Sequence, residues 1–218
     1  MLKNKIKLYC CKTMVDEIKA VKPVHMAVEY LEYALHRTPD KLRDELQKRI
    51  DEEKEADTLV FIYGLCSRGL DGLHARDKTL VIPRVHDCIS LLLGSRERYE
   101  EEFEADPGTY YLSKGWIDQK GDPYQGFQEI LNKYGEENAR WISEQTYQNY
   151  KRVAFIDTQL PKLEDYVNYS QSVADFLGVE HKKIQGDTNF FEQLVRGEWD
   201  QNCLVIPPGQ TSKYQDFL

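Results

Sequence analysis

The sequence predicts an α/β fold, in the form of a doubly wound, mainly parallel sheet of about six strands with helices on both faces. Three observations support this prediction. Short apolar runs rich in β-branched and aromatic residues recur along the chain, amphipathic helical patterns separate them, and several runs are nearly continuous in apolar residues. Continuous runs are typical of parallel strands buried on both faces. Two Rossmann-like halves are the open alternative.

The first half is expected to contain strands and one long helical region. Strands are predicted at residues 5–9, 57–66 and 78–84, with a helical region over residues 28–53. Within that region Thr38 is the expected N-cap of a helix whose first position is Pro39. The stretch "HDCISLLLGSRERYEEEF" is expected to form a helix from about Cys88, with a kink at Gly94.

The second half repeats the alternation of strands and helices. Strands are predicted at residues 152–159, 179–187 and 203–210, and helices at residues 127–151, 163–178 and 189–199. Between the halves, residues 106–126 are rich in Gly, Pro and aromatic residues, and we expect a loop or a lid there. We expect a single domain over residues 1–218, with 1–105 and 127–218 as its sub-lobes if it divides.

Composition excludes several classes of protein. The formal net charge of -8 argues against a general nucleic-acid binder, which normally shows a basic face. No apolar run approaches the roughly 18 residues that span a bilayer, and we expect a cytoplasmic protein without a membrane partner. Five cysteines, an odd number, point in that compartment to thiols or metal ligands rather than to a disulfide framework.

Three cysteines occupy equivalent positions, each directly after a predicted strand: Cys10, Cys66 and Cys88. The carboxyl ends of parallel strands share one edge of a sheet, where ligands bind in open α/β folds. Thiolates with one imidazole suit zinc or an iron–sulfur cluster, and His86 lies close to Cys88 in the chain. Three unrelated core thiols are the alternative. Cys203 begins its strand, and we expect it at the opposite edge with a structural role.

Other residues near this edge are candidates for supporting roles. His86 is predicted to be a fourth ligand or a general acid–base, and Asp87 to orient or charge-balance the site or to cap the next helix. An anionic group of a small molecule is expected to meet Arg68, Arg84 and Ser90. The remaining histidines on predicted helices and loops are expected at the surface: His25, His36 and His74.

Several stretches together resemble domain-of-unknown-function family 1638 (DUF1638): "YGLCSRGLDGL", "LVIPRVHDCISLLLGSRERYEEEF", "PGTYYLSKGW", "KYGEENA", "FIDT" and "GEWDQNCLVIPPGQ". The resemblance covers roughly residues 5–210, and "PRxHDCxxLLLGSRxRY" is its most specific part. This family occurs mainly in anaerobic bacteria and methanogenic archaea. The chain departs from the family pattern at Ser67, where Gly is common.

The resemblance implies a setting in one-carbon metabolism, because genes of this family often neighbour corrinoid-dependent methyltransferase systems. Direct corrinoid ligation by His86 is not expected, since the signature DxHxxG is not matched. Two hypotheses follow. The protein is a metal- or cluster-dependent protein that acts on or holds a small anionic molecule, or it is a non-catalytic accessory protein of a corrinoid methyltransferase with structural cysteines.

Overall fold

The computed structural model describes residues 5–217, which form two compact units. The first unit contains residues 5–96 and 188–217, and the second contains residues 97–187. The chain thus completes most of the first unit, forms the second and returns to the first. The prediction of a single domain over residues 1–218 stays a prediction.

The first unit contains a five-stranded sheet of order β2-β1-β3-β4-β8. Its strands are β1 (Ile6–Cys11), β2 (Ala27–Leu31), β3 (Thr58–Ile62), β4 (Thr79–Pro83) and β8 (Cys203–Ile206). The first four strands run parallel to one another, and β8 runs antiparallel to its neighbour β4. The mixed α/β class is therefore confirmed, whereas the prediction of one doubly wound sheet of six strands is wrong.

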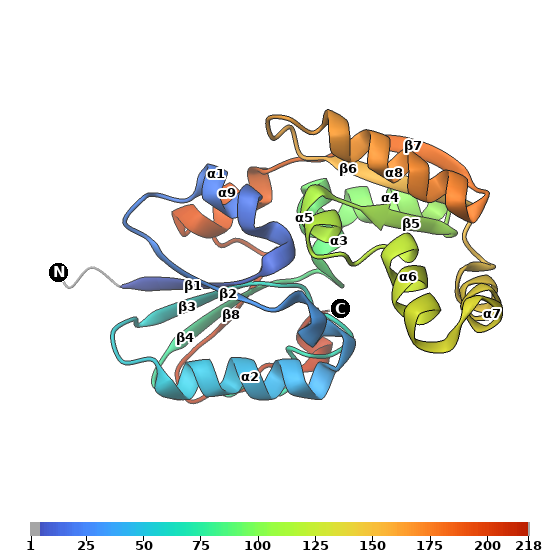
Figure 1. The fold of residues 1–218 in the computed structure, drawn as a ribbon. Helices are drawn as coiled ribbons and strands as arrows, with labels where there is room; N and C mark the ends of the chain where they lie inside the picture. Colours follow the sequence, from blue (N-terminus) through green and yellow to red (C-terminus); the bar gives the residue numbers. More distant parts are fainter. Residues whose placement is uncertain (1–4, 218) are drawn as a thin grey trace. The chain divides into compact units, whose positions relative to one another are not determined.

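Helices cover both faces of this sheet (Figure 1): α2 (Pro39–Glu52) lies on one face, and α1 (Val15–Val21) and α9 (Asn189–Arg196) lie on the other. As predicted, α2 begins at Pro39 with Thr38 as its N-cap. Its apolar stripe, which includes Leu42 and Leu46, is fully buried. The shorter helical segments are η1 (Lys12–Met14), η2 (Tyr33–Arg37), α3 (Cys88–Leu93) and η3 (Tyr214–Phe217).

The second unit contains a three-stranded parallel sheet of order β5-β6-β7. Helix α8 packs on β6 and β7, with Val173 and Phe155 in the shared core. Buried Arg152 on β6 pairs with Glu102 at 2.9 Å and so ties α4 to the sheet. The elements are α4 (Arg96–Ala105), β5 (Thr109–Leu112), α5 (Lys114–Asp118), α6 (Pro123–Tyr134), α7 (Glu136–Tyr147), β6 (Arg152–Asp157), α8 (Glu164–Leu177) and β7 (Glu180–Gln185).

Two strands lie where the sequence predicted something else. Strand β2 falls in the region expected to be helical. It is an edge strand with only one buried residue, so its sequence lacks the buried apolar run of a central strand, and its pairing with β1 outweighs the helical pattern. Strand β5 and helix α5 fall in the segment expected to be a loop or lid, so that prediction is wrong in its secondary structure. There the Ser113 hydroxyl caps α5 by accepting the amide of Trp116.

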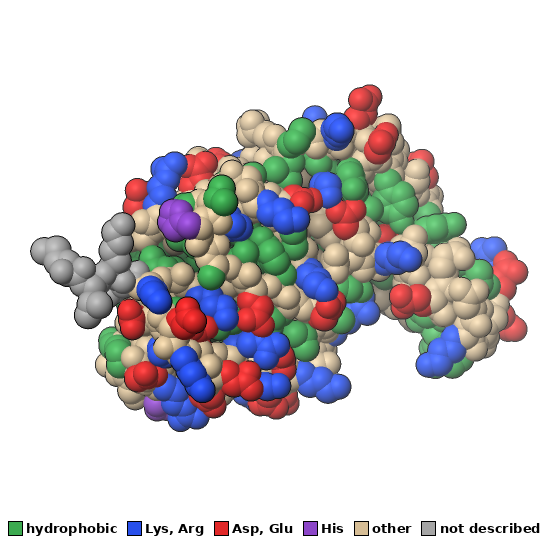
Figure 2. Space-filling model, turned by 60° about the vertical axis from the view of Figure 1, so that its left-hand side comes forward, with side chains coloured by type: hydrophobic (Ala, Val, Ile, Leu, Met, Phe, Trp, Pro, Cys, Tyr) green, Lys and Arg blue, Asp and Glu red, His purple; other side chains and the backbone are tan. Residues whose placement is uncertain are grey.

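Acidic and basic side chains are interspersed on the face shown in Figure 2 rather than sorted into patches of one sign. Within residues 5–217, no helix is both long enough and apolar enough to cross a membrane.

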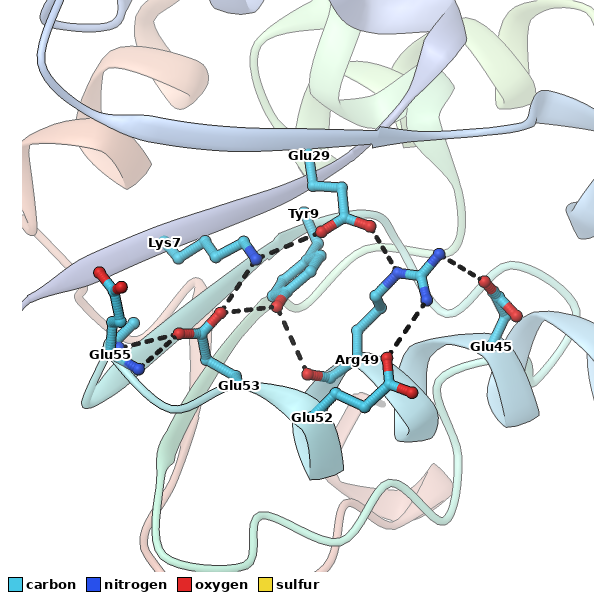
Figure 3. A network of polar contacts seen from close by, with 9 residues as sticks. Lys7, Tyr9, Glu29, Glu45, Arg49, Glu52, Glu53 and Glu55 are labelled. Atoms are coloured by element: carbon cyan, nitrogen blue, oxygen red, sulfur yellow. Dashed lines mark hydrogen bonds and ion pairs between the residues drawn. The ribbon is translucent and has the colours of Figure 1, made fainter.

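A network of charged side chains lies near the amino ends of the strands of the first sheet (Figure 3). The Lys7 ammonium lies 2.9 Å from Glu53 and 3.2 Å from Glu29, and it stands over the ring of Tyr9. Arg49 on α2 contacts the other oxygen of Glu29. The buried ring of Tyr9 therefore sits beneath charges that satisfy one another, and the network joins α2 to β1 and β2.

The pKa of Glu53 reflects this network. Burial alone would raise the pKa of its carboxyl group, but hydrogen bonds from Lys7 and from the backbone amides of Glu55 and Ala56 lower it to about 2. The folded-state pKa thus lies below the unfolded one. Its contribution to stability is complete above the ordinary pKa of 4.5 and is lost as the pH falls towards 2.

Replacing Glu53 with Gln should lower the free energy of unfolding at pH 7 by about 2 kcal/mol, because it removes charge-assisted hydrogen bonds from a nearly buried group. Urea denaturation at several pH values measures the effect, and the gap to the wild type should close as the pH falls from 4.5 towards 2. The control Glu52→Gln disturbs only an exposed ion pair and should cost less than about 0.5 kcal/mol. A gap for Glu53→Gln that does not change with pH would contradict the assignment.

Candidate functional site

The turns that follow β3 and β4 are held against each other. The amide of Leu65 donates to the carbonyl of Val85 at 2.8 Å, and the amide of Cys66 donates to the carbonyl of His86 at 2.9 Å. Gly64 makes this approach possible, since a Cβ atom there would lie 2.5 Å from the amide nitrogen of Asp87. The backbone therefore fixes Cys66 beside the turn that carries His86, Asp87 and Cys88.

All five cysteines lie at the same end of the first sheet. Cys10 and Cys11 end β1, Cys66 follows β3, and Cys88 begins α3 after β4. The predicted placement of Cys10, Cys66 and Cys88 at the carboxyl edge is thus confirmed. The prediction for Cys203 is wrong, because β8 is antiparallel and its first residue pairs with Pro83 at the end of β4.

The two neighbouring cysteines of β1 face opposite sides of the sheet. Tyr9 stacks on Phe61 at 5.4 Å between ring centroids and reaches α2 through its hydroxyl group. Because side chains alternate along a strand, Cys11 shares the α2 side with Tyr9, and Cys10 points to the other side. Continuing the register of β1 and β3 by one residue places Cys11 beside Tyr63.

Tyr63 follows β3 at the same end of the sheet as the thiols. Its side chain is only 3% exposed, and within the described residues its hydroxyl group makes no hydrogen bond. Burial raises the pKa of this phenol well above its usual value, and the nearby thiols of Cys11, Cys10, Cys66 and Cys88 raise it further. A buried hydroxyl group without a partner is costly, and such groups often meet a ligand or an ordered water molecule.

The thiols of Cys10, Cys11 and Cys66 are protonated at neutral pH in this state. Burial raises the pKa of Cys10, Cys11 and Cys66, and the carboxylate of Asp87 adds to the rise at Cys66. The hydroxyl of Thr13 donates to the sulfur of Cys11 at 3.2 Å. This hydrogen bond lowers the pKa of Cys11 but does not cancel the rise that burial causes. Protonated thiols are weak nucleophiles, so these three are poorly suited to covalent catalysis unless a cation is present.

Asp87 caps the helix that carries Cys88. Its carboxylate accepts the amide of Ile89 at 2.9 Å, and α3 begins at Cys88 as the sequence predicted. The helix has only six residues and ends at Gly94, whose φ of 93° produces the predicted break. Burial raises the pKa of Asp87, although the hydrogen bond from the amide of Ile89 opposes the rise. His86 is exposed on the same turn.

His36 follows β2 at the same end of the first sheet. It lies in η2 and is half-buried, so it is less exposed than His25, which was expected at the surface with it. Its Nδ1 atom donates to the carbonyl of Tyr33. Burial lowers the pKa of His36, and the carboxylate of Asp87 partly opposes this. No sequence signal marks the residue, because η2 follows a strand that reads as a helix.

The predicted anion-binding residues have different surroundings. Arg68 is largely exposed, pairs with Asp71 at 2.7 Å and lies over the ring of Tyr214. Arg84 and Ser90 each keep a buried polar atom without a hydrogen-bond partner in the described part of the chain: Nε in Arg84 and Oγ in Ser90. The hydroxyl group of Tyr30, near the end of β2, is also buried without a hydrogen-bond partner in the described chain. Unsatisfied polar atoms therefore collect near the carboxyl ends of three strands.

The turn after β3 is strained and clamped. Cys66, Ser67 and Arg68 have φ values of 46°, 54° and 75°, in the left-handed region that favours glycine. Farther along, the hydroxyl of Ser212 donates to the carbonyl of Leu70 at 2.6 Å. The C-terminal segment thereby holds the end of the loop that carries Cys66.

The donor atoms do not form a ready-made metal site. Among residues 5–217, no group of three or more Cys, His, Asp or Glu side chains is arranged so that it could hold a metal ion. The sequence-predicted ligands are gathered at one edge, but any coordination would require their side chains or the Cys66 turn to move closer together.

These features define the class of protein: an α/β protein whose parallel strands end in a cysteine-rich edge with unsatisfied polar groups. The chain belongs to the family described as "Protein of unknown function (DUF1638)", whose model matches residues 30–195. The resemblance found in the sequence is therefore confirmed. Comparison with curated proteins and with solved structures found no match.

Replacing Gly64 with Ala should lower the free energy of unfolding by about 2 kcal/mol or more, because the new methyl group would meet backbone atoms of His86 and Asp87. Chemical denaturation measures the loss. The matched control is Gly126→Ala in α6, where the Cβ atom would lie 3.7 Å from the Tyr147 hydroxyl and the helix should gain about 0.5–1 kcal/mol. Equal stability of Gly64→Ala and wild type would show that the two turns are not packed as described.

Asp87→Ala should cost about 1 kcal/mol, because it removes the cap of α3. Asp87→Asn should be nearly neutral by the same measurement, since Asn caps helices about as well as Asp. If both variants lose the same stability, the carboxylate charge matters more than the cap.

Proposed function

We propose that the carboxyl edge of the first sheet binds a thiophilic metal ion, either zinc or the iron of an iron–sulfur cluster, and that this centre holds or acts on a small anionic molecule. The observation that carries the proposal is that four thiols, those of Cys10, Cys11, Cys66 and Cys88, lie at the exits of three neighbouring strands of one sheet, where the hydroxyl group of Tyr63 is buried without a partner in the described chain. Thiolates are the preferred ligands of both kinds of centre.

The electrostatics of the edge favour a cation. Burial raises the pKa of Cys10 and Cys66, and a negative charge on Cys11 would raise both further, as the carboxylate of Asp87 does for Cys66. The thiols in turn raise the pKa of Tyr63. A bound cation reverses these effects, because it stabilises every anionic form nearby and displaces protons from the thiols. The protein would therefore release protons when it takes up metal.

Metal binding requires the donors to draw together. Cys66 lies in the left-handed turn, beside the exposed Ser67 and Arg68, where no regular secondary structure holds the side chains. Cys11 and Cys88 lie in regular secondary structure, at the end of β1 and at the start of α3. Because the amide of Cys66 is hydrogen-bonded to the carbonyl of His86, the side chain of Cys66, rather than its backbone, would have to turn towards the ion.

An anionic molecule would meet Arg84 and Ser90. Both have buried polar atoms that lack a hydrogen-bond partner in the described chain, and the guanidinium group of Arg84 is a suitable donor for a carboxylate or phosphate. Arg68 would have to leave Asp71 to take part. His86, exposed beside Cys88, is placed to exchange protons with solvent.

A second candidate function is ligand binding without a metal. The unsatisfied Ser90, Arg84 and Tyr30 atoms favour it, since they need a polar partner whether or not a metal is bound. In that case the cysteines are structural, and the protein is a non-catalytic binding protein. An accessory role beside a corrinoid methyltransferase rests on the family resemblance alone.

Metal analysis of protein purified without oxygen tests the proposal. Protein from cells supplied with zinc or with iron should contain about one metal centre per chain, colourless for zinc and brown for a cluster. Cys66→Ala and Cys88→Ala should lose it. Cys203→Ala is the matched control, because Cys203 is a buried cysteine that is not among the thiols around Tyr63, and this variant should keep the metal.

Wild-type protein without metal from either preparation would contradict the metal proposal and leave the second candidate. Equal loss in Cys203→Ala would show that the ligands have been wrongly assigned.

A further inference from the structure

We infer that the anionic molecule held at this edge is a small carboxylic acid, whose carboxylate group is bound by Arg84 and by the hydroxyl group of Tyr63, an inference that rests on the proposed function for the presence of an anion. The observation behind it is that these two residues are opposite each other on neighbouring strands, and that each has a buried polar atom without a hydrogen-bond partner in the described chain.

The register of the sheet places Tyr63 beside Arg84. The last pair of β3 and β4 is Val60 with Val81, and continuing this register by three residues brings Tyr63 opposite Arg84. The amide of Leu65, which donates at 2.8 Å to the turn after β4, keeps the same register beyond the regular strands. The backbones of the two residues are therefore held about 4.8 Å apart, as neighbouring strands are.

Both side chains follow the same face of the sheet. Phe61, two residues before Tyr63, stacks on Tyr9, whose hydroxyl group reaches α2. Side chains alternate along a strand, and residues that are opposite each other on parallel strands point to the same face. Tyr63 and Arg84 therefore share the α2 face, on which Cys11 also lies.

Arg84 is a cation that the chain places but does not neutralise. Its amide donates to the carbonyl of Asn202 at 2.8 Å, which fixes the backbone between β4 and β8. Its Nε atom is buried without a hydrogen bond, and no ion pair among residues 5–217 involves its guanidinium group. Arg68, in contrast, is held by Asp71 at 2.7 Å. A partly buried cation without a counter-ion is costly, so Arg84 is suited to receive an anion.

Tyr63 supplies a second donor at the same place. Its side chain is 3% exposed, and its hydroxyl group does not accept from Arg84 or donate to any described residue. The phenol and the guanidinium group are both donors, and neither satisfies the other. A shared acceptor satisfies both, and an oxygen atom of a bound anion is such an acceptor.

The chemistry of these groups favours a carboxylate over a phosphate. The Nε atom and a terminal nitrogen of a guanidinium group form a planar fork that matches the two oxygen atoms of a carboxylate. Arg84 is the one charged residue in the row that it forms with Cys11, Tyr63 and Asn202. One positive charge balances a monoanion, whereas a phosphate dianion would keep an excess negative charge close to Asp87.

Thermal unfolding of the metal-free protein with increasing acetate or glycolate tests the inference, with chloride holding the ionic strength constant. Both carboxylates should raise the melting temperature to a plateau, and inorganic phosphate should not. Arg84→Lys keeps the charge but loses the fork, and it should weaken carboxylate binding at least about tenfold. Tyr63→Phe should weaken it about fivefold, because one hydrogen bond is lost. Arg76→Ala, which removes an exposed partner of Asp51, is the control and should bind as the wild type does.

Urea denaturation without any carboxylate gives a second measurement. Tyr63→Phe should be at least as stable as the wild type, because the hydroxyl group that it removes has no partner to lose. A clear loss of stability in this variant would show that the hydroxyl group is already satisfied in the free protein and would overturn the role of Tyr63.

The outcomes separate this inference from the metal proposal. Wild-type protein that contains the metal centre but binds neither acetate nor glycolate would overturn the inference alone. The same result follows from equal binding of phosphate, or from unchanged carboxylate binding in Arg84→Lys. Carboxylate binding that depends on Arg84, in a protein that takes up no metal in either preparation, would contradict the metal proposal alone and support the second candidate function.

Discussion

The close approach of the turns after β3 and β4 decides how the carboxyl edge of the first sheet is built. It depends on Gly64, because a Cβ atom at that position would lie within 3 Å of backbone atoms of Asp87. Two backbone hydrogen bonds then continue the pairing beyond the regular strands as far as Cys66 and His86. The position of Cys66 beside the cap of α3 thus follows from backbone geometry, before any side chain is considered.

The two ends of the same sheet use polar groups in opposite ways. Near the amino ends, Lys7 and Glu53 satisfy each other, and the effect is visible in the lowered pKa of Glu53. At the carboxyl ends, the hydroxyl group of Tyr63 is buried without a partner in the described chain, and this burial raises its pKa. A fold that satisfies its charges at one end and leaves donors unsatisfied at the other is suited to bind a ligand at the second end.

The sequence predicted the parts of the fold that have strong local patterns. The buried runs of β3, β4 and β6 and the start of α2 at Pro39 were recognised, whereas β2 was missed because an edge strand lacks a buried pattern. The direction of β8 depends on its pairing with β4, so the place of Cys203 could not be predicted.

X-ray absorption spectroscopy of the metal in protein purified without oxygen tests the central claim most directly, because it reports the atoms bound to the metal. For zinc, the account predicts a shell of sulfur atoms at about 2.3 Å together with a nitrogen shell at about 2.0 Å. For a cluster it predicts iron bound by sulfur. A spectrum with only oxygen and nitrogen neighbours would show adventitious metal and would contradict the claim that the cysteine-rich edge is a metal centre.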